Sequence, residues 1–250
     1  MKFYMWTNAV KILLITGWGG GTLLLESLKQ HLEQKNYIVE LMNIFDVYDS
    51  EVLQHKIEHA KAYDVIVGWS LGGQLATVLA SEIQQQYQYN KILITLASNP
   101  CFVEHVDWPF AMSTTAFEQF KNSFHMDAVA TLKKFGFMVC QGVITAKEDF
   151  KYLQSLIQAQ NLDTLSHGLN ALAGLDNVNI LKNYMGHQYH IFAKQDYLVS
   201  YKIEHIIANL SAKYLQTELI NGSHGFPVFN AKEISCKIYQ YLEGVAQSKV

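Results

Sequence analysis

The chain has 250 residues, of which 50% are hydrophobic and 16% carry a formal charge. This apolar content excludes a disordered chain, because segments stay unfolded when they have too few apolar side chains to bury, and a chain of this length needs no disulfide or metal to complete its core. All 19 basic residues are lysine and the net charge is −3, which argues against a dedicated nucleic-acid-binding protein, since such proteins carry a basic face.

Apolar runs alternate with helical patterns over the first hundred residues. We expect strands at residues 11–16, 37–42, 64–69 and 91–97, and helices at residues 22–35, 50–61 and 71–87. Continuous apolar strands separated by helices are typical of a parallel sheet that is covered on both faces.

The alternation stops after Ala97 and resumes near residue 188. Residues 113–185 have helical periodicity without a convincing strand, and a strand at 188–193, a helix at 201–210, a strand at 214–220 and a helix at 231–245 follow. The sequence therefore predicts an α/β core of residues 1–112 and 186–250, with a helical lid of residues 113–185 inserted after the strand that ends near Ala97.

Residues 68–72 (GWSLG) fit the pattern G-x-S-x-G, between a predicted strand and a predicted helix. Such a strand-turn-helix presents a nucleophilic serine on a strained turn, with glycines that let the strand and helix approach closely. We predict that Ser70 is a nucleophile. The alternative is a glycine-rich turn with an incidental serine.

A serine nucleophile needs a base that is oriented by a carboxylate, and in this arrangement the chain order is serine, acid, histidine. His224 follows the last predicted strand and Asp196 follows the strand before it, so we predict that they are the base and the acid. Asp163 and Asp176 lie in the helical insertion and are weaker candidates. The alternative is that Asp196 and His224 are ordinary surface-loop residues.

Two backbone N–H groups must bind the oxyanion of a tetrahedral intermediate. We expect one from Leu71, which follows the nucleophile, and one from Trp18 in the glycine-rich turn of residues 17–21 after the first strand. That turn lacks the Lys-Ser/Thr of a phosphate-binding loop and the spacing G-x-G-x-x-G, so nucleotide binding is not favoured.

Residues 55–59 (HKIEH) match the zinc-protease pattern H-x-x-E-H. Two histidines four residues apart share one helix face, but no third ligand is evident, and we favour a solvated helix face without a metal. The three cysteines, Cys101, Cys140 and Cys236, are widely spaced and odd in number, which is typical of buried thiols in a reducing compartment.

Residues 1–10 lack the apolar run of a signal peptide. The longest early apolar stretch, residues 12–15, is far shorter than the about 18 residues that span a membrane. We therefore expect a cytoplasmic protein that binds neither membrane nor nucleic acid.

The chain resembles the α/β-hydrolases and, among them, the pimeloyl-acyl carrier protein methyl ester esterases of biotin synthesis. The resemblance lies in five segments: residues 17–19 (GWG), 68–76 (GWSLGGQLA), 97–102 (ASNPCF) with Trp108-Pro109, 145–151 (TAKEDFK) and 168–170 (GLN). It implies an α/β-hydrolase fold with a helical lid over an acyl pocket, and a cofactor-free, monomeric esterase that releases methanol and the free acid.

The resemblance also implies roles for single residues. Ser70, Asp196 and His224 match the family's catalytic triad. Trp18 and Leu71 match its oxyanion and substrate contacts, and Phe135 to Val139 match a lid stretch that lines the acyl pocket. Lys134, Lys147 and Lys151 stand where the family places arginines that face the carrier protein and its phosphopantetheine arm.

Two other functions use the same fold. A general short-chain carboxylesterase or a thioesterase would use the same triad, since ester and thioester hydrolysis share it. A non-catalytic homologue would hold a ligand tightly without turnover, and the presence of Ser70, Asp196 and His224 argues against it.

Overall fold

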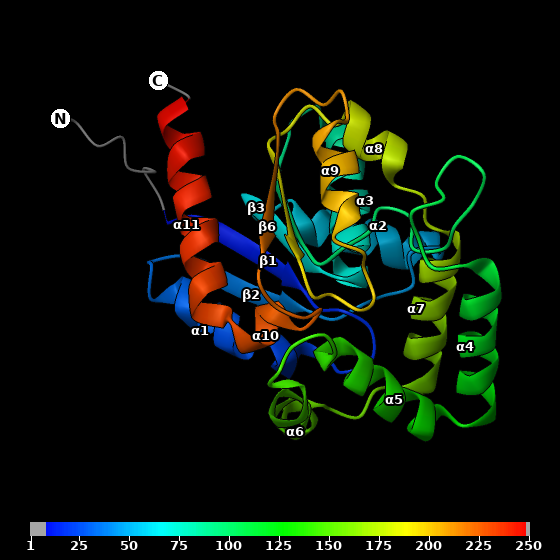
Figure 1. Cartoon of the computed structure of the whole chain (residues 1–250). Helices are drawn as coiled ribbons and strands as arrows, with labels where there is room; N and C mark the ends of the chain where they lie inside the picture. Colours follow the sequence, from blue (N-terminus) through cyan, green and yellow to red (C-terminus); the bar gives the residue numbers. More distant parts are fainter. Residues whose placement is uncertain (1–8, 249–250) are drawn as a thin grey trace.

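A computed structural model describes residues 9–248, and its centre is one sheet of six parallel strands (Figure 1). The strand order is β2-β1-β3-β4-β5-β6. The strands are β1 (Lys11–Ile15), β2 (Ile38–Met42), β3 (Val65–Trp69), β4 (Ile92–Leu96), β5 (Gln188–Ala193) and β6 (Leu215–Ile220). The predicted parallel sheet is confirmed. The expectation about a targeting signal concerns mostly residues 1–8, which lie outside the described residues.

The inner strands are apolar throughout because both faces of the sheet are covered. Every residue of β3, β4 and β5 is buried, whereas the edge strands β2 and β6 are partly exposed. Successive side chains point to opposite faces, so the sheet divides the core in two. Leu13 and Ile66 belong to one apolar cluster and Leu14 and Val67 to the other.

Different helices cover the two faces. On the face of Leu13, the core includes α2 (Ser50–Ala60), α3 (Leu71–Tyr87) and α9 (Lys202–Ala208). On the face of Leu14, it includes α1 (Glu26–Glu33), α10 (Phe226–Phe229) and α11 (Ala231–Ser248). The helix expected at residues 22–35 begins as a 3-10 turn, η1 (Thr22–Leu25), before α1.

Five helices lie between β4 and β5: α4 (Thr114–Met126), α5 (Ala128–Cys140), α6 (Ala146–Leu156), α7 (Leu162–Gly174) and α8 (Val178–Asn183). Helices α4 to α7 stand together beside one end of the sheet, while α8 lies against α3 of the core (Figure 1). Caps separate the helices, since Ser113 accepts from Ala116 N–H and Asp127 accepts from Ala130 N–H. The division into a core and a lid at residues 113 and 185 stays a prediction. Within residues 9–248, no helix combines the length and the apolar character needed to cross a membrane.

His190 makes the stability of the fold depend on pH. Its ring is buried in β5 and shares a hydrogen bond of 2.7 Å with Thr95 Oγ1. Burial lowers the pKa of His190 to about 3, while an unfolded histidine has a pKa of about 6.5. Between these two pKa values, His190 is protonated in the unfolded chain and neutral in the folded chain. The stabilisation that His190 gives above pH 6.5 is therefore lost as the pH falls toward 3.

We expect the wild type to lose about 2 kcal/mol more of its unfolding free energy between pH 7 and pH 5 than His190→Gln does. Urea unfolding at the two pH values measures this difference. His55→Gln, which changes an exposed histidine, is the control and should follow the wild type. Equal losses in wild type and His190→Gln would contradict the prediction.

Candidate active site

Ser70 occupies the turn between β3 and α3 in a conformation that non-glycine residues rarely adopt, with φ 56° and ψ −121°. The surrounding glycines explain the pattern G-x-S-x-G. A Cβ on Gly68 would lie 2.0 Å from the Gly72 carbonyl oxygen, and one on Gly72 would lie 2.4 Å from the Ile15 carbonyl oxygen. Only glycine allows α3 to start this close to β3 and β1, so the strained serine is built into the packing of the sheet.

Backbone hydrogen bonds hold this strained turn. Ser70 N–H donates to the Leu96 carbonyl at 2.9 Å. The Ser70 carbonyl accepts from Gly73 N–H at 2.9 Å and from Ser98 Oγ at 2.7 Å. Ser98 was not among the predicted site residues. The signal that could have identified it is its position just after β4, beside the end of β3 in the parallel sheet.

The structure brings Asp196 and His224 together at the ends of β5 and β6. Asp196 Oδ2 lies 2.8 Å from His224 Nδ1, and both side chains are only 1% exposed. Asp196 Oδ1 accepts from Leu198 N–H at 2.8 Å and from Val199 N–H at 2.9 Å. These bonds fix the carboxylate, which in turn fixes the imidazole with the proton on Nδ1.

His224 Nε2 is buried and has no hydrogen-bond partner within the described part of the chain. Such an atom is costly and is expected mainly at functional sites. The indole N–H of Trp69, the residue before Ser70, donates to the His224 carbonyl at 3.0 Å, and the two rings lie 5.9 Å apart. The histidine therefore stands beside the serine turn. No Ser70–His224 hydrogen bond is formed among residues 9–248, and such contacts often tighten only when substrate binds.

Both predicted oxyanion donors lie next to Ser70. Leu71 is the first residue of α3, where amides have no partner within the helix. The loop of Trp18 passes the nucleophile, since a Cβ on Gly17 would lie 3.3 Å from the Ser70 Cβ. The Trp18 side chain is buried and its indole N–H donates to the Leu165 carbonyl of α7 at 2.8 Å. Donation to an oxyanion by Trp18 and Leu71 stays a prediction.

A narrow apolar cavity of about 20 Å³ opens beside Ser70. It is lined by Trp18, Ser70, Phe102, Met112, Phe120, Phe135, Met138, Leu172 and Leu198. Val139 lines a neighbouring cavity of similar volume, and Trp18 and Phe135 form part of both walls. This volume holds about one water molecule, so an acyl chain enters only after side chains of the lid move.

The lid is bonded to the loops that carry the histidine and the acid. Gly225 N–H, next to His224, donates to the Val139 carbonyl of α5 at 3.0 Å. Gly142 follows α5 with φ 101°, and a Cβ there would lie 2.0 Å from the Gln195 carbonyl oxygen, next to Asp196. The end of α5 therefore has a fixed position relative to Asp196 and His224.

The loop of residues 97–112 contributes Phe102 and Met112 to the cavity wall. Neither was predicted from the sequence as a pocket residue. Buried Asn99 closes this loop. Its Oδ1 accepts from the Trp108 indole N–H at 3.0 Å and its Nδ2 donates to the Phe110 carbonyl at 3.1 Å. The segments ASNPCF and Trp108-Pro109 are thus two sides of one closed loop. Met138 lies within the predicted stretch Phe135 to Val139. Phe120 of α4, Leu172 of α7 and Leu198 of the loop after β5 escaped prediction, because only the packing of the fold brings them together.

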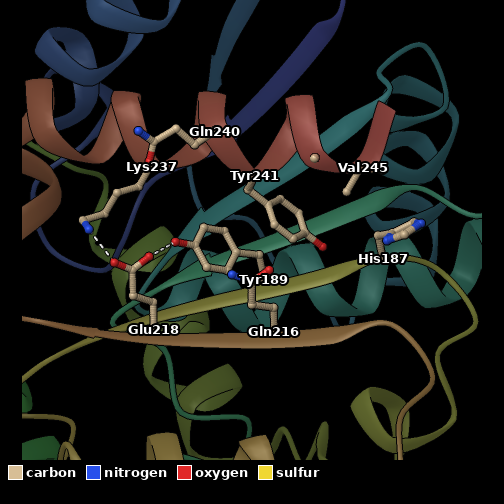
Figure 2. A pocket seen from close by; sticks show the side chains of 9 residues that line it. His187, Tyr189, Gln216, Glu218, Lys237, Gln240, Tyr241 and Val245 are labelled. Carbon is tan, nitrogen blue, oxygen red and sulfur yellow. Dashed lines mark hydrogen bonds and ion pairs between the residues drawn. The ribbon is translucent and has the colours of Figure 1, made fainter. Parts of the chain in front are cut away.

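Two wider pockets lie outside this cavity. A cleft of about 630 Å³ shares Met112 and Leu198 with it, and Lys194 and Lys202 are among its other lining residues. A pocket of about 350 Å³ lies between α11 and the edge of the sheet (Figure 2). Its polar groups bond one another, since Glu218 binds both Tyr189 and Lys237. It contains none of the predicted site residues.

The predicted carrier-contact lysines are not part of the cavity. Lys134 of α5 and Lys147 and Lys151 of α6 are exposed. None of the three has an ion pair with another described residue. Lys134 directly precedes Phe135, so α5 presents a cation outward beside a side chain that lines the cavity.

The residues of the H-x-x-E-H pattern make ordinary surface contacts. His59 Nε2 lies 2.8 Å from Glu40 Oε1, and Glu58 binds Lys61 at 2.7 Å. In the described part of the chain, these residues do not gather with a third ligand. Of the weaker acid candidates, Asp163 lies in the first turn of α7 and Asp176 pairs with His105, whereas His224 pairs with Asp196.

The chain has the α/β-hydrolase fold, in which a parallel sheet carries a nucleophile on the turn after a central strand. A family model for class 3 lipases matches residues 23–136. The structure is similar to that of a bromoperoxidase from Bacillus anthracis, with a TM-score of 0.80 and 17% identity over 94% of this chain and 92% of that chain.

Proteins that are similar in sequence have more specific names than the structural neighbours. A pimeloyl-[acyl-carrier protein] methyl ester esterase from Wigglesworthia glossinidia brevipalpis is 28% identical over 97% of this chain and 98% of that protein. The biotin biosynthesis bifunctional protein BioHC of Teredinibacter turnerae is 29% identical over 71% of this chain and 32% of that protein. The chain thus spans about a third of the bifunctional relative and nearly all of the esterase.

Proposed function

We propose that the chain is a serine carboxylesterase that hydrolyses the methyl ester of pimeloyl-acyl carrier protein to methanol and pimeloyl-acyl carrier protein. The observation that carries this proposal is the buried Asp196–His224 pair with an open Nε2, beside the strained Ser70 at an apolar cavity. The likeness over nearly the full length to an esterase of that name supports the choice of substrate.

The geometry supports an acyl-enzyme mechanism. His224 Nε2 accepts the Ser70 proton as Oγ attacks the ester carbonyl, and Asp196 stabilises the imidazolium through Nδ1–H. The N–H groups of Leu71 and Trp18 bind the oxyanion. His224 then gives its proton to the departing methoxide, which leaves as methanol. Water attacks the acyl-enzyme with His224 as the base, which restores the free serine.

The two ends of the proposed substrate need different surroundings. The methyl ester must reach Ser70, while the thioester end stays attached to a carrier protein outside. The apolar cavity suits the methylene chain between them, because it offers few polar groups to desolvate. Helix α5 connects the two regions, since Phe135 lines the cavity and Lys134 faces solvent. An acidic carrier protein that docks on α5 and α6 would meet exposed lysines.

The direct test compares substrates with the purified full chain. Hydrolysis of methyl pimeloyl-acyl carrier protein to methanol at a higher kcat/KM than a nitrophenyl ester is the expected result. Turnover of nitrophenyl esters alone would favour a general esterase, and release of free carrier thiol would favour a thioesterase. Rescue of a biotin auxotroph that lacks this step gives an independent readout.

Charge reversal on the lid should affect the carrier-linked substrate selectively. We expect Lys147→Glu/Lys151→Glu to raise KM for the carrier-linked ester by about 10-fold, because rim charges steer an oppositely charged partner, and to leave kinetics with nitrophenyl esters unchanged. Lysine attracts an acidic partner as a mobile point charge, without arginine's bidentate fork. Because salt screens attraction between exposed charges, added salt should also raise the wild-type KM for the carrier-linked ester.

A matched pair of reversals serves as the control. Lys182→Glu/Lys213→Glu changes two exposed lysines outside α5 and α6 and should leave KM near the wild-type value. If Lys194→Glu/Lys202→Glu alone raises KM, the carrier docks at the 630 Å³ cleft instead. Equal effects on carrier-linked and nitrophenyl esters would exclude a docking role for Lys147 and Lys151.

A further inference from the structure

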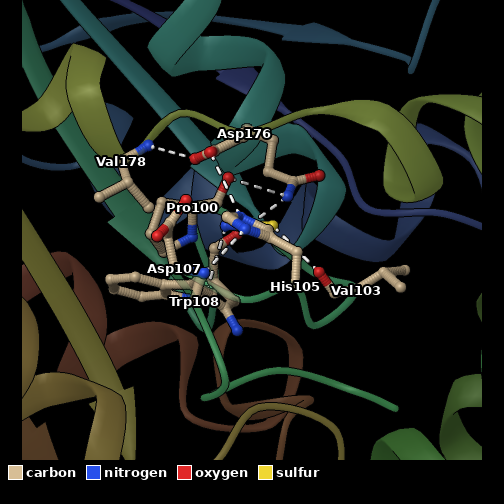
Figure 3. Close-up of polar contacts among 10 residues, drawn as sticks. Pro100, Val103, His105, Asp107, Trp108, Asp176 and Val178 are labelled. Carbon is tan, nitrogen blue, oxygen red and sulfur yellow. Dashed lines mark hydrogen bonds and ion pairs between the residues drawn. The ribbon is translucent and has the colours of Figure 1, made fainter. Parts of the chain in front are cut away.

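Three side chains with metal-binding groups meet where the lid joins the core. The Cys101 thiol, the His105 ring and the Asp176 carboxylate have donor atoms that all lie within 4.8 Å of one another. Cys101 and Asp176 also form an isolated antiparallel bridge. In Figure 3, His105 and Asp176 face each other across this junction, and dashed lines mark the contacts of the cluster. None of the three residues lines the cavity that contains Ser70.

The separation of the donor atoms suits a tetrahedral zinc ion. Two nitrogen or oxygen ligands at about 2.0–2.1 Å from zinc stand about 3.3 Å apart in a tetrahedron. His105 Nε2 and Asp176 Oδ2 lie 3.3 Å apart. Thiolate, imidazole and carboxylate are all zinc ligands, and the combination with a soft thiolate disfavours magnesium and calcium.

The remaining contacts of these residues leave the donor atoms available. Asp176 Oδ1 accepts from Val178 N–H at 3.0 Å, which orients the carboxylate while Oδ2 faces His105. The Cys101 thiol donates to the Val103 carbonyl at 3.1 Å, and zinc would replace its proton. His105 Nδ1 accepts a long contact of 3.3 Å from Asp107 N–H, which a zinc-bound neutral ring would give up.

We propose that Cys101, His105 and Asp176 bind one zinc ion, with water as the fourth ligand. The ion would tie the loop of residues 97–112 to the turn between α7 and α8, where Asn177 N–H already donates to the Pro100 carbonyl at 3.0 Å. That loop supplies Phe102 and Met112 to the cavity. Zinc would thus stabilise the junction of lid and core, apart from the ester chemistry at Ser70.

Zinc binding is tested on the full chain after removal of metals with a chelator. Calorimetric titration with zinc chloride should show one tight site per chain, and saturating zinc should raise Tm, since a ligand that binds only the folded state stabilises it. Because the chain has ten histidines, cobalt(II) provides a more selective probe: the wild type should show a thiolate-to-cobalt charge-transfer band, which surface histidines cannot give.

Cys101→Ser should abolish this band, and Cys101→Ser and His105→Ala should each weaken zinc binding on the order of 100-fold. His167→Ala is the matched control, because His167 Nδ1 lies 3.5 Å from Asp46 Oδ2 in a surface pair without a thiol. Cys236→Ser is the thiol control. Both should bind zinc like the wild type. A wild type without the cobalt band would overturn the proposal even if the variants failed to fold, and so would tight binding that survives in Cys101→Ser. Esterase activity enters none of these readouts.

Discussion

Replacement of Ser70 by alanine is expected to lower kcat for the carrier-linked ester by on the order of 10⁴–10⁶, the range for loss of a nucleophile that works with a base and an oriented acid. The backbone conformation at this position is imposed by Gly68 and Gly72, so alanine would occupy the same strained turn. KM should change little, because the cavity walls keep their side chains. Steady-state kinetics with the carrier-linked ester gives both constants.

A serine-reactive phosphonate provides the second readout for Ser70. The wild type should be labelled once per chain and Ser70→Ala not at all, with circular dichroism showing that the variant is folded. Ser155→Ala changes an exposed serine on α6 and is the control, with labelling and turnover like those of the wild type. Persistent labelling of Ser70→Ala would mean that another residue is the nucleophile.

Much of the sheet could be predicted from the sequence because of how parallel strands are buried. Strands that are covered on both faces are apolar at every position, so residues 64–69 and 91–97 differ sharply from the amphipathic helices between them. The observed strands β3 and β4 lie within these ranges. The helix expected at residues 22–35 begins with a 3-10 turn, which could not be foreseen because apolar spacing over four residues does not separate a 3-10 turn from an α-helix.

The positions of Ser70, Asp196 and His224 also follow from the sheet. In a parallel sheet the carboxyl ends of all strands lie at one edge, so loops after β3, β5 and β6 are brought near one another whatever their distance along the chain. No comparable rule of sheet geometry predicts which side chains line the cavity. Phe120 and Leu172 come from different lid helices, and only helix packing places them at one cavity.

The cluster of Cys101, His105 and Asp176 could not be predicted from the sequence either. Cys101 alone has the properties of a small buried hydrophobe, and burial does raise the pKa of its thiol to about 11. Its neighbour Asp176 comes from the far end of the lid, and no sequence spacing links the two. The junction that joins them exists only because the lid begins and ends at adjacent strands, β4 and β5.

Asp196→Asn is expected to lower kcat on the order of 10⁴ although the two side chains have the same shape. Asp196 Oδ1 accepts from the N–H groups of Leu198 and Val199. An asparagine must keep its carbonyl oxygen there, since its NH₂ group cannot accept a hydrogen bond. The NH₂ group then faces His224 Nδ1 and donates to it. The imidazole proton moves to Nε2, which can no longer accept the proton of Ser70.

Two measurements separate this tautomer effect from a general loss of structure. Nitrogen NMR of the His224 ring should show the proton on Nδ1 in the wild type and on Nε2 in Asp196→Asn, while the unfolding transition stays close to that of the wild type. Asp163→Asn is the matched control, because Asp163 is exposed at the start of α7, and it should keep kcat unchanged. Full activity in Asp196→Asn together with loss in Asp163→Asn would transfer the role of the acid to the lid. The buried contact of 2.8 Å between Asp196 Oδ2 and His224 Nδ1 is the physical reason to expect the opposite.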